Sequence, residues 1–180
     1  MMVKTFFAVL LLAVVSITPL ASAQDKPMDA PGAPGCGDPN ARFEVNSDKG
    51  QHPAQPQAGK ALVYFIQDDS QFDSSPKPTT RAGVDGKWVG TTHHNSYFYF
   101  FVDPGVQHLC ASWQLAVLLG QGRKTAAAHF TAEPGDTYYF VAKDIWWRYG
   151  KGGLTLTPVD SDQGQLMVQS LQFATSHPKK

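Results

Sequence analysis

Residues 96–113 constrain the fold of this chain more than any other stretch of its sequence. Six aromatic or β-branched residues run from Tyr97 to Val102, a composition typical of a β-strand. The turn-forming residues 103–105 (Asp-Pro-Gly) follow, and the run 106–113 then alternates between polar and apolar side chains. This pattern predicts a β-hairpin.

The first strand of this expected hairpin is apolar on both faces, because successive side chains of a strand point to opposite sides of the sheet. The two faces carry Phe98, Phe100 and Val102 on one side and Tyr97, Tyr99 and Phe101 on the other. A strand with two bulky apolar faces is typical of the centre of a covered sheet. We therefore expect the strand at 97–102 to form the centre of the core.

Further strand patterns and turns continue along the chain. Strands are expected at Phe43 and Val45, 60–66, 81–84, 87–90, 125–132, 137–142 and 154–159, with a tight turn at Asp85-Gly86 and corners at 103–105 and 133–136. Asp160 and Gln163 have the spacing of a capping box, which predicts a short helix after the last strand. The expected fold class is all-β, an antiparallel β-sandwich of about seven strands with a short C-terminal helix.

The N-terminus has the features of an export signal. Lys4 provides the positive charge, 6–15 is a continuous apolar run, and Ala21-Ser22-Ala23 is a small-residue cleavage pattern. We expect cleavage after Ala23 and a periplasmic or secreted protein with no transmembrane span after cleavage. The expected organisation is a signal peptide at 1–23, a flexible Pro/Gly-rich leader at 24–58, the sandwich domain at 59–174 and a tail at 175–180.

The charge balance excludes one class of partner. The whole chain has equal numbers of basic and acidic residues, and Lys4 is the only charged residue of the expected signal. The mature chain therefore carries one net negative charge, which gives no electrostatic reason to expect nucleic acid as a partner.

The two cysteines, Cys36 and Cys110, both remain after the expected cleavage. An even number of cysteines in an oxidising compartment favours a disulfide, which would tie the leader to the 106–113 strand. The alternative is that Cys110 is a small buried residue and Cys36 is free in a loop.

Signatures of nucleophilic catalysis are missing. Ser70, Ser74 and Ser75 lie in a long polar stretch, 67–80, that we expect to be a loop, but no Gly-x-Ser-x-Gly motif occurs. Cys110 lies in the middle of an expected strand, a poor position for a reactive thiolate. The sequence therefore predicts no catalytic residues.

The histidines do not form a metal-binding motif. His93 and His94 are adjacent, so in a strand they point to opposite sides, whereas His108 and His129 lie on different expected strands and could meet in space. There is no His-Glu-x-x-His or Cys-x-x-Cys motif. We expect no metal site and no cofactor.

Two further patterns are weak. Residues 120–125 (Gly-Gln-Gly-Arg-Lys-Thr) superficially resemble a phosphate-binding loop, but an arginine separates the glycine from the lysine, so we expect a hairpin loop. The acidic pairs Asp68-Asp69 and Asp160 with Asp162 lack the ligand spacing of a calcium loop, and we interpret them as turn residues and a helix start.

An aromatic cluster provides the candidate binding residues, Trp146, Trp147, Arg148 and Tyr149. It precedes a glycine-rich connection between two expected strands, and exposed aromatics beside an arginine are common in binding surfaces. The alternative is that one of the tryptophans covers the end of the core.

The order of several short motifs resembles the bacterial family called domain of unknown function 2846. These motifs are Gly59–Tyr64, Val84–Lys87 with Gly90, Ser96–Phe100, Pro104-Gly105 with His108-Leu109, and Pro134-Gly135 with Thr137–Tyr139. The resemblance spans about 59–171 and implies an exported β-domain, often a lipoprotein, with no established activity and no catalytic residues. This chain departs from that pattern because it has no cysteine at a lipoprotein position.

These observations favour a non-catalytic exported β-sandwich domain that binds or scaffolds at the cell envelope, with an envelope protein or a glycan as its partner. Two alternatives remain open. One is a carbohydrate-binding module, which would present coplanar exposed tryptophans. The other is an envelope hydrolase that uses the 67–80 stretch with a distant histidine, which would require Ser, His and Asp within hydrogen-bond reach in a pocket.

Overall fold

A computed structural model describes residues 35–179 apart from 51, 56, 115–121 and 148–150. The expected signal peptide, the first part of the leader, Arg148, Tyr149 and the apolar run 115–119 lie outside the described residues. Among the described residues, no helix has the length and apolar character needed to cross a bilayer.

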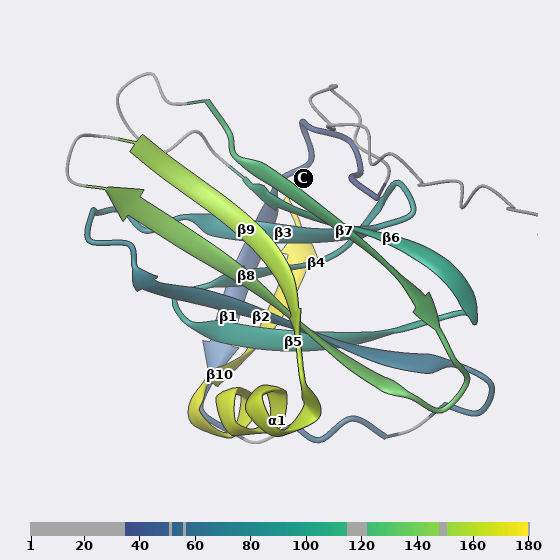
Figure 1. The fold of residues 1–180 in the computed structure, drawn as a ribbon. Coiled ribbons are helices and arrows are strands. Elements are labelled where there is room, and N and C mark those ends of the chain that lie inside the picture. Colours follow the sequence, from purple (N-terminus) through teal and green to yellow (C-terminus); the bar gives the residue numbers. More distant parts are fainter. Residues whose placement is uncertain (1–34, 51, 56, 115–121, 148–150, 180) are drawn as a thin grey trace, which may run out of the picture.

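The described residues form ten strands and one helix. Their bounds are β1 Phe43–Asp48, β2 Ala61–Gln71, β3 Thr79–Val84, β4 Lys87–His93, β5 Ser96–Val102, β6 Gly105–Trp113, β7 Thr125–Ala132, β8 Thr137–Trp147, β9 Lys151–Val159, α1 Ser161–Ser170 and β10 Gln172–Pro178. One sheet has the order β1-β10-β5-β2-β8-β9 and the other has the order β4-β3-β6-β7 (Figure 1). All neighbours are antiparallel except β2 with β8 and β10 with β5. The predicted β-sandwich with a helix near the C-terminus is confirmed, with more strands than expected.

The predicted hairpin between β5 and β6 is wrong. β5 pairs with β2 and β10 in the six-stranded sheet, whereas β6 pairs with β3 and β7 in the other. The turn at 103–105 is therefore a corner at which the chain passes from one sheet to the other, with Gly105 at a φ of 115°. The same turn residues suit a hairpin and a corner, so the turn does not decide which strands pair. The pairing depends instead on contacts with distant strands.

The central position of β5 is confirmed by burial on both of its faces. Phe98 and Val102 belong to the core between the two sheets, together with Val63, Phe65 and Phe140. On the opposite face, Tyr97 is buried with Tyr64, Ile66, Tyr139 and Val141, under half-buried residues of α1, Met167 and Val168. The helix thus covers the outer face of the six-stranded sheet, as Figure 1 shows.

Helix α1 begins where the capping-box pattern predicts, and it packs on the sheet most closely at Gly164. Asp160 is the N-cap, and its Oδ1 accepts a hydrogen bond from the backbone N of Gln163 at 2.9 Å. Gly164 is the buried residue of the helix, and a Cβ at this position would lie 2.2 Å from Cγ of Tyr139. At Gly164 the helix therefore lies so close to Tyr139 that no side chain fits at this position.

We expect Gly164→Ala to lower the free energy of unfolding by about 2 kcal/mol, because overpacking at Tyr139 outweighs the better helix propensity of alanine. Urea unfolding monitored by circular dichroism measures the change. Gln163→Ala, on the exposed side of the same helix turn, serves as the control and should be close to neutral. Equal stability of Gly164→Ala and the parent would show that the helix does not depend on this close contact.

The folded part of the chain is longer than the expected 59–174. β1 lies within the segment expected to be a flexible leader, and it pairs with β10 from Phe43 opposite Pro178 to Asp48 opposite Phe173. β10 in turn extends into the expected tail. β10 joins the sheet by pairing with β5, and β1 joins it at the edge by pairing with β10, which provides the partners for its backbone hydrogen bonds.

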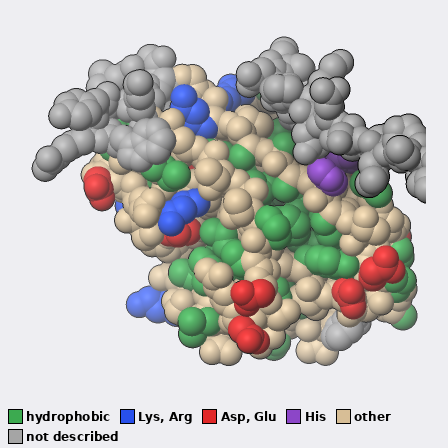
Figure 2. Space-filling view, viewed as in Figure 1, with side chains coloured by type: hydrophobic (Ala, Val, Ile, Leu, Met, Phe, Trp, Pro, Cys, Tyr) green, Lys and Arg blue, Asp and Glu red, His purple; other side chains and the backbone are tan. Residues whose placement is uncertain are grey.

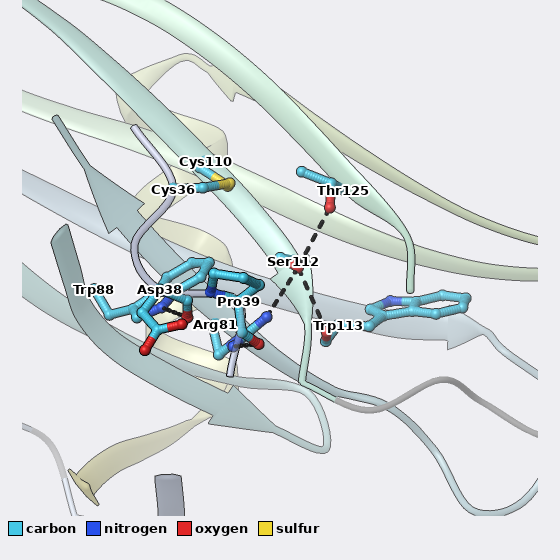
Figure 3. The surroundings of a disulfide bond; sticks show 9 residues. All are labelled: Cys36, Asp38, Pro39, Arg81, Trp88, Cys110, Ser112, Trp113 and Thr125. Atoms are coloured by element: carbon cyan, nitrogen blue, oxygen red, sulfur yellow. Dashed lines mark hydrogen bonds between the residues drawn. A yellow bond between two sulfur atoms is a disulfide. The ribbon is translucent and has the colours of Figure 1, made fainter. Parts of the chain in front are cut away.

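The predicted disulfide between Cys36 and Cys110 is confirmed. Cys110 lies on the outer face of β6, so the bridge holds residues 35–42 across the outside of the four-stranded sheet (Figure 3). Gly35 lies so close to this sheet that a Cβ there would be 2.4 Å from the carbonyl oxygen of His108. A disulfide is compatible with a periplasmic or extracellular location.

The core reaches the surface where the edges of the two sheets approach each other. β7 is the last strand of one sheet and β9 the last strand of the other. Between them the half-buried Phe130 lies 4.7 Å from Tyr138 and 5.1 Å from Phe140, measured between ring centroids. Figure 2 shows hydrophobic side chains gathered on this face.

Candidate functional site

Polar and titratable side chains gather at the end of the sandwich where β2, β4 and β8 finish and β3 begins. The expected loop 67–80 is shorter than predicted, since β2 continues to Gln71 and β3 begins at Thr79. β2 and β8 run parallel with Gln71 opposite Ile145, so their ends lie side by side. The connection 72–78 spans this end.

A pocket of about 560 Å³ opens beside this connection. Its lining consists of Phe72, Asp73, Ser74, Ser75, Pro76, Lys77, His93 and His94. Most of these side chains are polar, and the buried Phe72 anchors the loop by packing on the core residue Trp113 at 5.7 Å between ring centroids. The pocket therefore combines hydrogen-bonding groups with a loop that is fixed to the core.

Beneath the pocket lies Asp69, whose side chain is fully buried. Its Oδ1 accepts a hydrogen bond from Nζ of Lys77 at 2.9 Å, and its backbone N donates to Oδ1 of Asn95 at 2.8 Å. Oδ2 lies 3.8 Å from Nδ1 of His94 and has no hydrogen bond within the described part of the chain. The interpretation of Asp68-Asp69 as turn residues is wrong, because both belong to β2.

A second buried carboxylate, Asp144 of β8, lies between the two sheets at the same end. Its Oδ1 accepts hydrogen bonds from Nε1 of Trp113 at 2.6 Å and Oγ1 of Thr80 at 3.2 Å, and its Oδ2 accepts one from Nε2 of Gln67 at 2.5 Å. Burial raises the pKa of Asp144 to about 7, against the opposing effect of these three donors. The network links four strands and makes this end of the sandwich rigid.

His93 and His94 lie together at the pocket because the chain turns sharply after β4. His94 and Asn95 have φ values of 53° and 40°, so the rings of His93 and His94 lie 3.6 Å apart instead of on opposite sides of a strand. The expectation that these two histidines point apart is therefore wrong. Both residues line the pocket, and the turn also places Asn95 against Asp69.

His93 is half-buried, whereas His94 is exposed. Burial, followed by the neighbouring His94, lowers the pKa of His93 below its usual value of 6.5, so this ring is neutral near pH 7. Nδ1 of His93 lies 3.3 Å from Oγ1 of Thr79 and 3.4 Å from the carbonyl oxygen of Pro78. If Nδ1 donates to that carbonyl, Nε2 is left as an acceptor. The side chain of His94 is exposed.

The arrangement contains no nucleophile paired with a base among the described residues. Ser74 and Ser75 line the same pocket as the histidines, but neither hydroxyl has a hydrogen bond to a histidine. Ser70 instead hydrogen-bonds Asp68, and Cys110 is in the disulfide. No group of three or more His, Cys, Asp or Glu side chains in the described ranges could hold a metal ion. The pocket presents hydrogen-bonding groups on a lining whose surface is mainly apolar.

The candidate binding residues lie at the same end of the molecule. Trp146 is half-buried, and its ring lies 5.4 Å from the ring of Phe72, in a small cluster with the buried Trp113. It therefore packs behind the pocket, which matches the alternative that a tryptophan covers the end of the core. The side chains of Trp147, Arg148 and Tyr149 lie outside the described residues, and their binding role stays a prediction.

The other histidine pair does meet in space. His108 and His129 are directly opposite each other in β6 and β7, with ring centroids 6.4 Å apart, and both are exposed. Asp160 caps α1, as predicted. Of the segment 120–125, residues 122–124 precede β7 and Thr125 begins it.

Sequence reasoning missed the buried polar residues that support the pocket, Gln67, Asp69 and Asp144. A signal was available in the alternation of β2, because positions 63, 65, 67 and 69 share one strand face. The predicted strand ends at Ile66, because the polar residues after it are typical of a loop. Their pairing with partners from other strands became visible only in the folded chain.

Comparison with family models, curated proteins and solved structures finds no match to this chain. The resemblance to the domain of unknown function 2846 family therefore stays a prediction. The function has to be argued from the geometry of the site.

Proposed function

We propose that this chain is a non-catalytic exported β-sandwich domain that binds a polar ligand at the cell envelope, either an envelope protein or a glycan. The observation that carries the proposal is the pocket between the 72–78 connection and the turn after β4. Its hydroxyl, imidazole, carboxylate and ammonium groups can donate and accept hydrogen bonds, as polar ligands require.

The support beneath the pocket favours recognition of a ligand. Lys77 is held by Asp69, His93 by Thr79 and Pro78, and Phe72 by the core. Side chains that are already in place lose little conformational entropy when a ligand binds. A pocket whose side chains are already held in place is therefore suited to binding a ligand.

Export is the second part of the proposal. The charged start, apolar run and small-residue cleavage pattern of residues 1–23 support it. The disulfide is compatible with the oxidising compartment that export reaches. The partner is then a component of the periplasm, the cell surface or the medium.

An envelope hydrolase is the second candidate, and one observation favours it. Ser74, Ser75, His93 and His94 line one pocket, with Asp69 directly below His94. A serine hydrolase also needs a hydrogen bond between the serine and a histidine, which the described residues lack. Labelling of Ser74 or Ser75 by a fluorophosphonate probe would establish the hydrolase and reject the non-catalytic proposal.

The binding test uses the mature chain, residues 24–180, immobilised for capture from envelope extract and probed in parallel on a glycan array. We expect the parent to retain a protein from the extract or to give a glycan signal on the array. The amount bound should fall about tenfold in His94→Ala and in Ser75→Ala, because each substitution removes a hydrogen-bonding group that lines the pocket.

His177→Ala is the matched control, because it also removes an exposed histidine but lies on β10 against β1. It should retain full binding. Retention that is equal in the parent and in both pocket variants would place the binding surface elsewhere and contradict the assignment of the pocket.

A further inference from the structure

Three arginine side chains converge on one backbone oxygen, the carbonyl of Pro39. Nη1 of Arg81 donates to this oxygen at 3.1 Å, Nη1 of Arg42 lies 3.4 Å from it, and Nη1 of Arg123 also donates to it. The arginines come from three distant parts of the chain, namely β3, the segment before β1 and the segment before β7. The bridge between Cys36 and Cys110 holds Pro39 in this place.

Among the described residues no carboxylate forms an ion pair with any of the three arginines, although the charge of Asp38 is near enough to favour the charged form of Arg81. Burial, followed by the charges of Arg123 and Arg42, lowers the pKa of Arg81 to about 10. Three like charges held together without a matching anion are costly, unless an anion from solution joins them.

Arg81 is the buried base of the cluster, at 1 % exposure. Its Nη1 also donates to the carbonyl oxygen of Ala41 at 2.9 Å, its Nη2 donates to Oγ of Ser112 at 3.3 Å, and its guanidinium stacks on Trp88 at 4.2 Å (Figure 3). Its Nε is buried and has no hydrogen-bond partner within the described part of the chain. A buried, partly unsatisfied cation of this kind is a fixed source of positive potential.

We propose that Arg42, Arg81 and Arg123 form a binding site for a phosphate group. Arg123 is exposed and Arg42 is half-buried, so both are accessible to a ligand, while Arg81 contributes charge from below. Nε and Nη2 of Arg42 and of Arg123 have no hydrogen bond to any described residue, which leaves two guanidinium edges free to donate. A guanidinium edge matches two oxygens of a tetrahedral oxyanion, and two edges can hold one phosphate from two sides.

The site is distinct from both the pocket and the phosphate-loop motif. The segment 120–125 fails as a phosphate-binding loop because its arginine interrupts the motif. In the folded chain that same residue, Arg123, is the side chain that joins the cluster. The phosphate is recognised by side-chain guanidinium groups from three segments and not by the backbone of one loop.

The test titrates the mature protein with inorganic phosphate by isothermal calorimetry at low ionic strength. We expect saturable binding that weakens about tenfold or more in Arg123→Ala and recovers only partly in Arg123→Lys, because lysine restores the charge without the guanidinium edge. Lys124→Ala is the matched control, since it removes the adjacent positive charge, and its affinity should stay within about twofold of the parent. Circular dichroism confirms that each variant is folded.

A second arm distinguishes the sources of the phosphate group. Vesicles of phosphatidylcholine with and without phosphatidic acid are tested for co-sedimentation of the same variants. Binding to inorganic phosphate alone supports a free anion, and Arg123-dependent binding to phosphatidic acid vesicles supports a lipid headgroup. The absence of binding in both arms, or an equal loss in Lys124→Ala and Arg123→Ala, would overturn the proposal.

Discussion

The free energy of unfolding should fall by about 4 kcal/mol between pH 4 and pH 8 through the ionisation of Asp144 alone. The pKa of this carboxyl is about 7 in the folded chain and 3.8 as its ordinary value, with burial as the main cause. Between these two values the folded protein holds a proton that the unfolded chain has released. The stability from this group is therefore complete below about pH 4 and is lost as the pH rises through 7.

Asp144→Asn isolates this effect, because other groups titrate in the same range. Asp68 has a lowered pKa and His93 a lowered pKa, and both make the folded state more stable as the pH rises. Asp68 and His93 are present in both proteins, so their contributions cancel when the free energy of unfolding of Asp144→Asn is subtracted from that of the parent at each pH. We expect this difference to fall steeply with pH, as measured by urea unfolding at intervals from pH 4 to 8.

The amide of Asp144→Asn can be accommodated in the network. Its oxygen can still accept from Trp113 and Thr80, but its NH₂ group takes the place of Oδ2 and faces Nε2 of Gln67, which is also a donor. It reaches Oε1 of Gln67 only if that amide flips, which gives up the hydrogen bond from Nε2 to the carbonyl oxygen of Pro78. The loss of one hydrogen bond lowers the stability by about 1 kcal/mol at every pH, so the variant should still fold and the pH dependence of the difference is unaffected. Parallel stability profiles for the parent and Asp144→Asn would mean that Asp144 titrates normally in the folded protein.

Loss of the disulfide should lower the free energy of unfolding by about 4 kcal/mol, because it frees a loop that the bridge closes in the unfolded chain. Cys36 and Cys110 are 74 residues apart in the sequence, and a long closed loop restricts the unfolded chain strongly. In the folded state the bridge also holds residues 35–42 on the outer face of the four-stranded sheet. Those residues supply the carbonyl groups of Pro39 and Ala41 that bind Arg81.

The double variant Cys36→Ala with Cys110→Ala measures this contribution by urea unfolding. Alanine leaves no polar group at the buried position of Cys110. Reducing agent should destabilise the parent to a similar extent and have no effect on the double variant. Because reduction breaks the bridge but leaves both cysteine side chains in place, this comparison separates the loss of the bridge from the loss of side-chain packing. A change below about 1 kcal/mol would show that the bridge adds little to the stability of the fold.

Local features of the fold were predictable because they depend on neighbouring residues. Asp85 and Gly86 form the expected turn, with φ values of 46° and 83°, since these residue types tolerate the left-handed conformation. Asp160 caps the helix for a similarly local reason, because its side chain reaches a backbone N three residues later. The bridge between Cys36 and Cys110 was predictable for a different reason: the chain has two cysteines, so only one pairing within it is possible.

The site was less predictable, because it depends on contacts between distant segments. Asp144 and Gln67 are polar residues inside strands, and both can be buried because they bond each other and further partners, Trp113 and Thr80 for Asp144 and Pro78 for Gln67. The same holds for Arg81, whose partners are carbonyl groups about forty residues earlier in the chain. No pattern within a short window of sequence identifies such partners.

By itself the sequence determined where the helix and most of the strands form and that the 97–102 strand is covered on both faces, because alternation and apolar content act within one segment. It did not reveal β10 or the polar second half of β2. Only the tertiary structure decided that the 96–113 stretch is divided between two sheets. The reason is physical: the turn at 103–105 allows a hairpin or a corner, and β5 pairs with β2, whose partner residues lie 31 to 41 positions earlier. That pairing places one face of β5 in the core between the sheets and the other in the cluster that α1 covers. The pairing of β3 with β6 and of β6 with β7 likewise brought Arg81 and Arg123 to the same side of the four-stranded sheet.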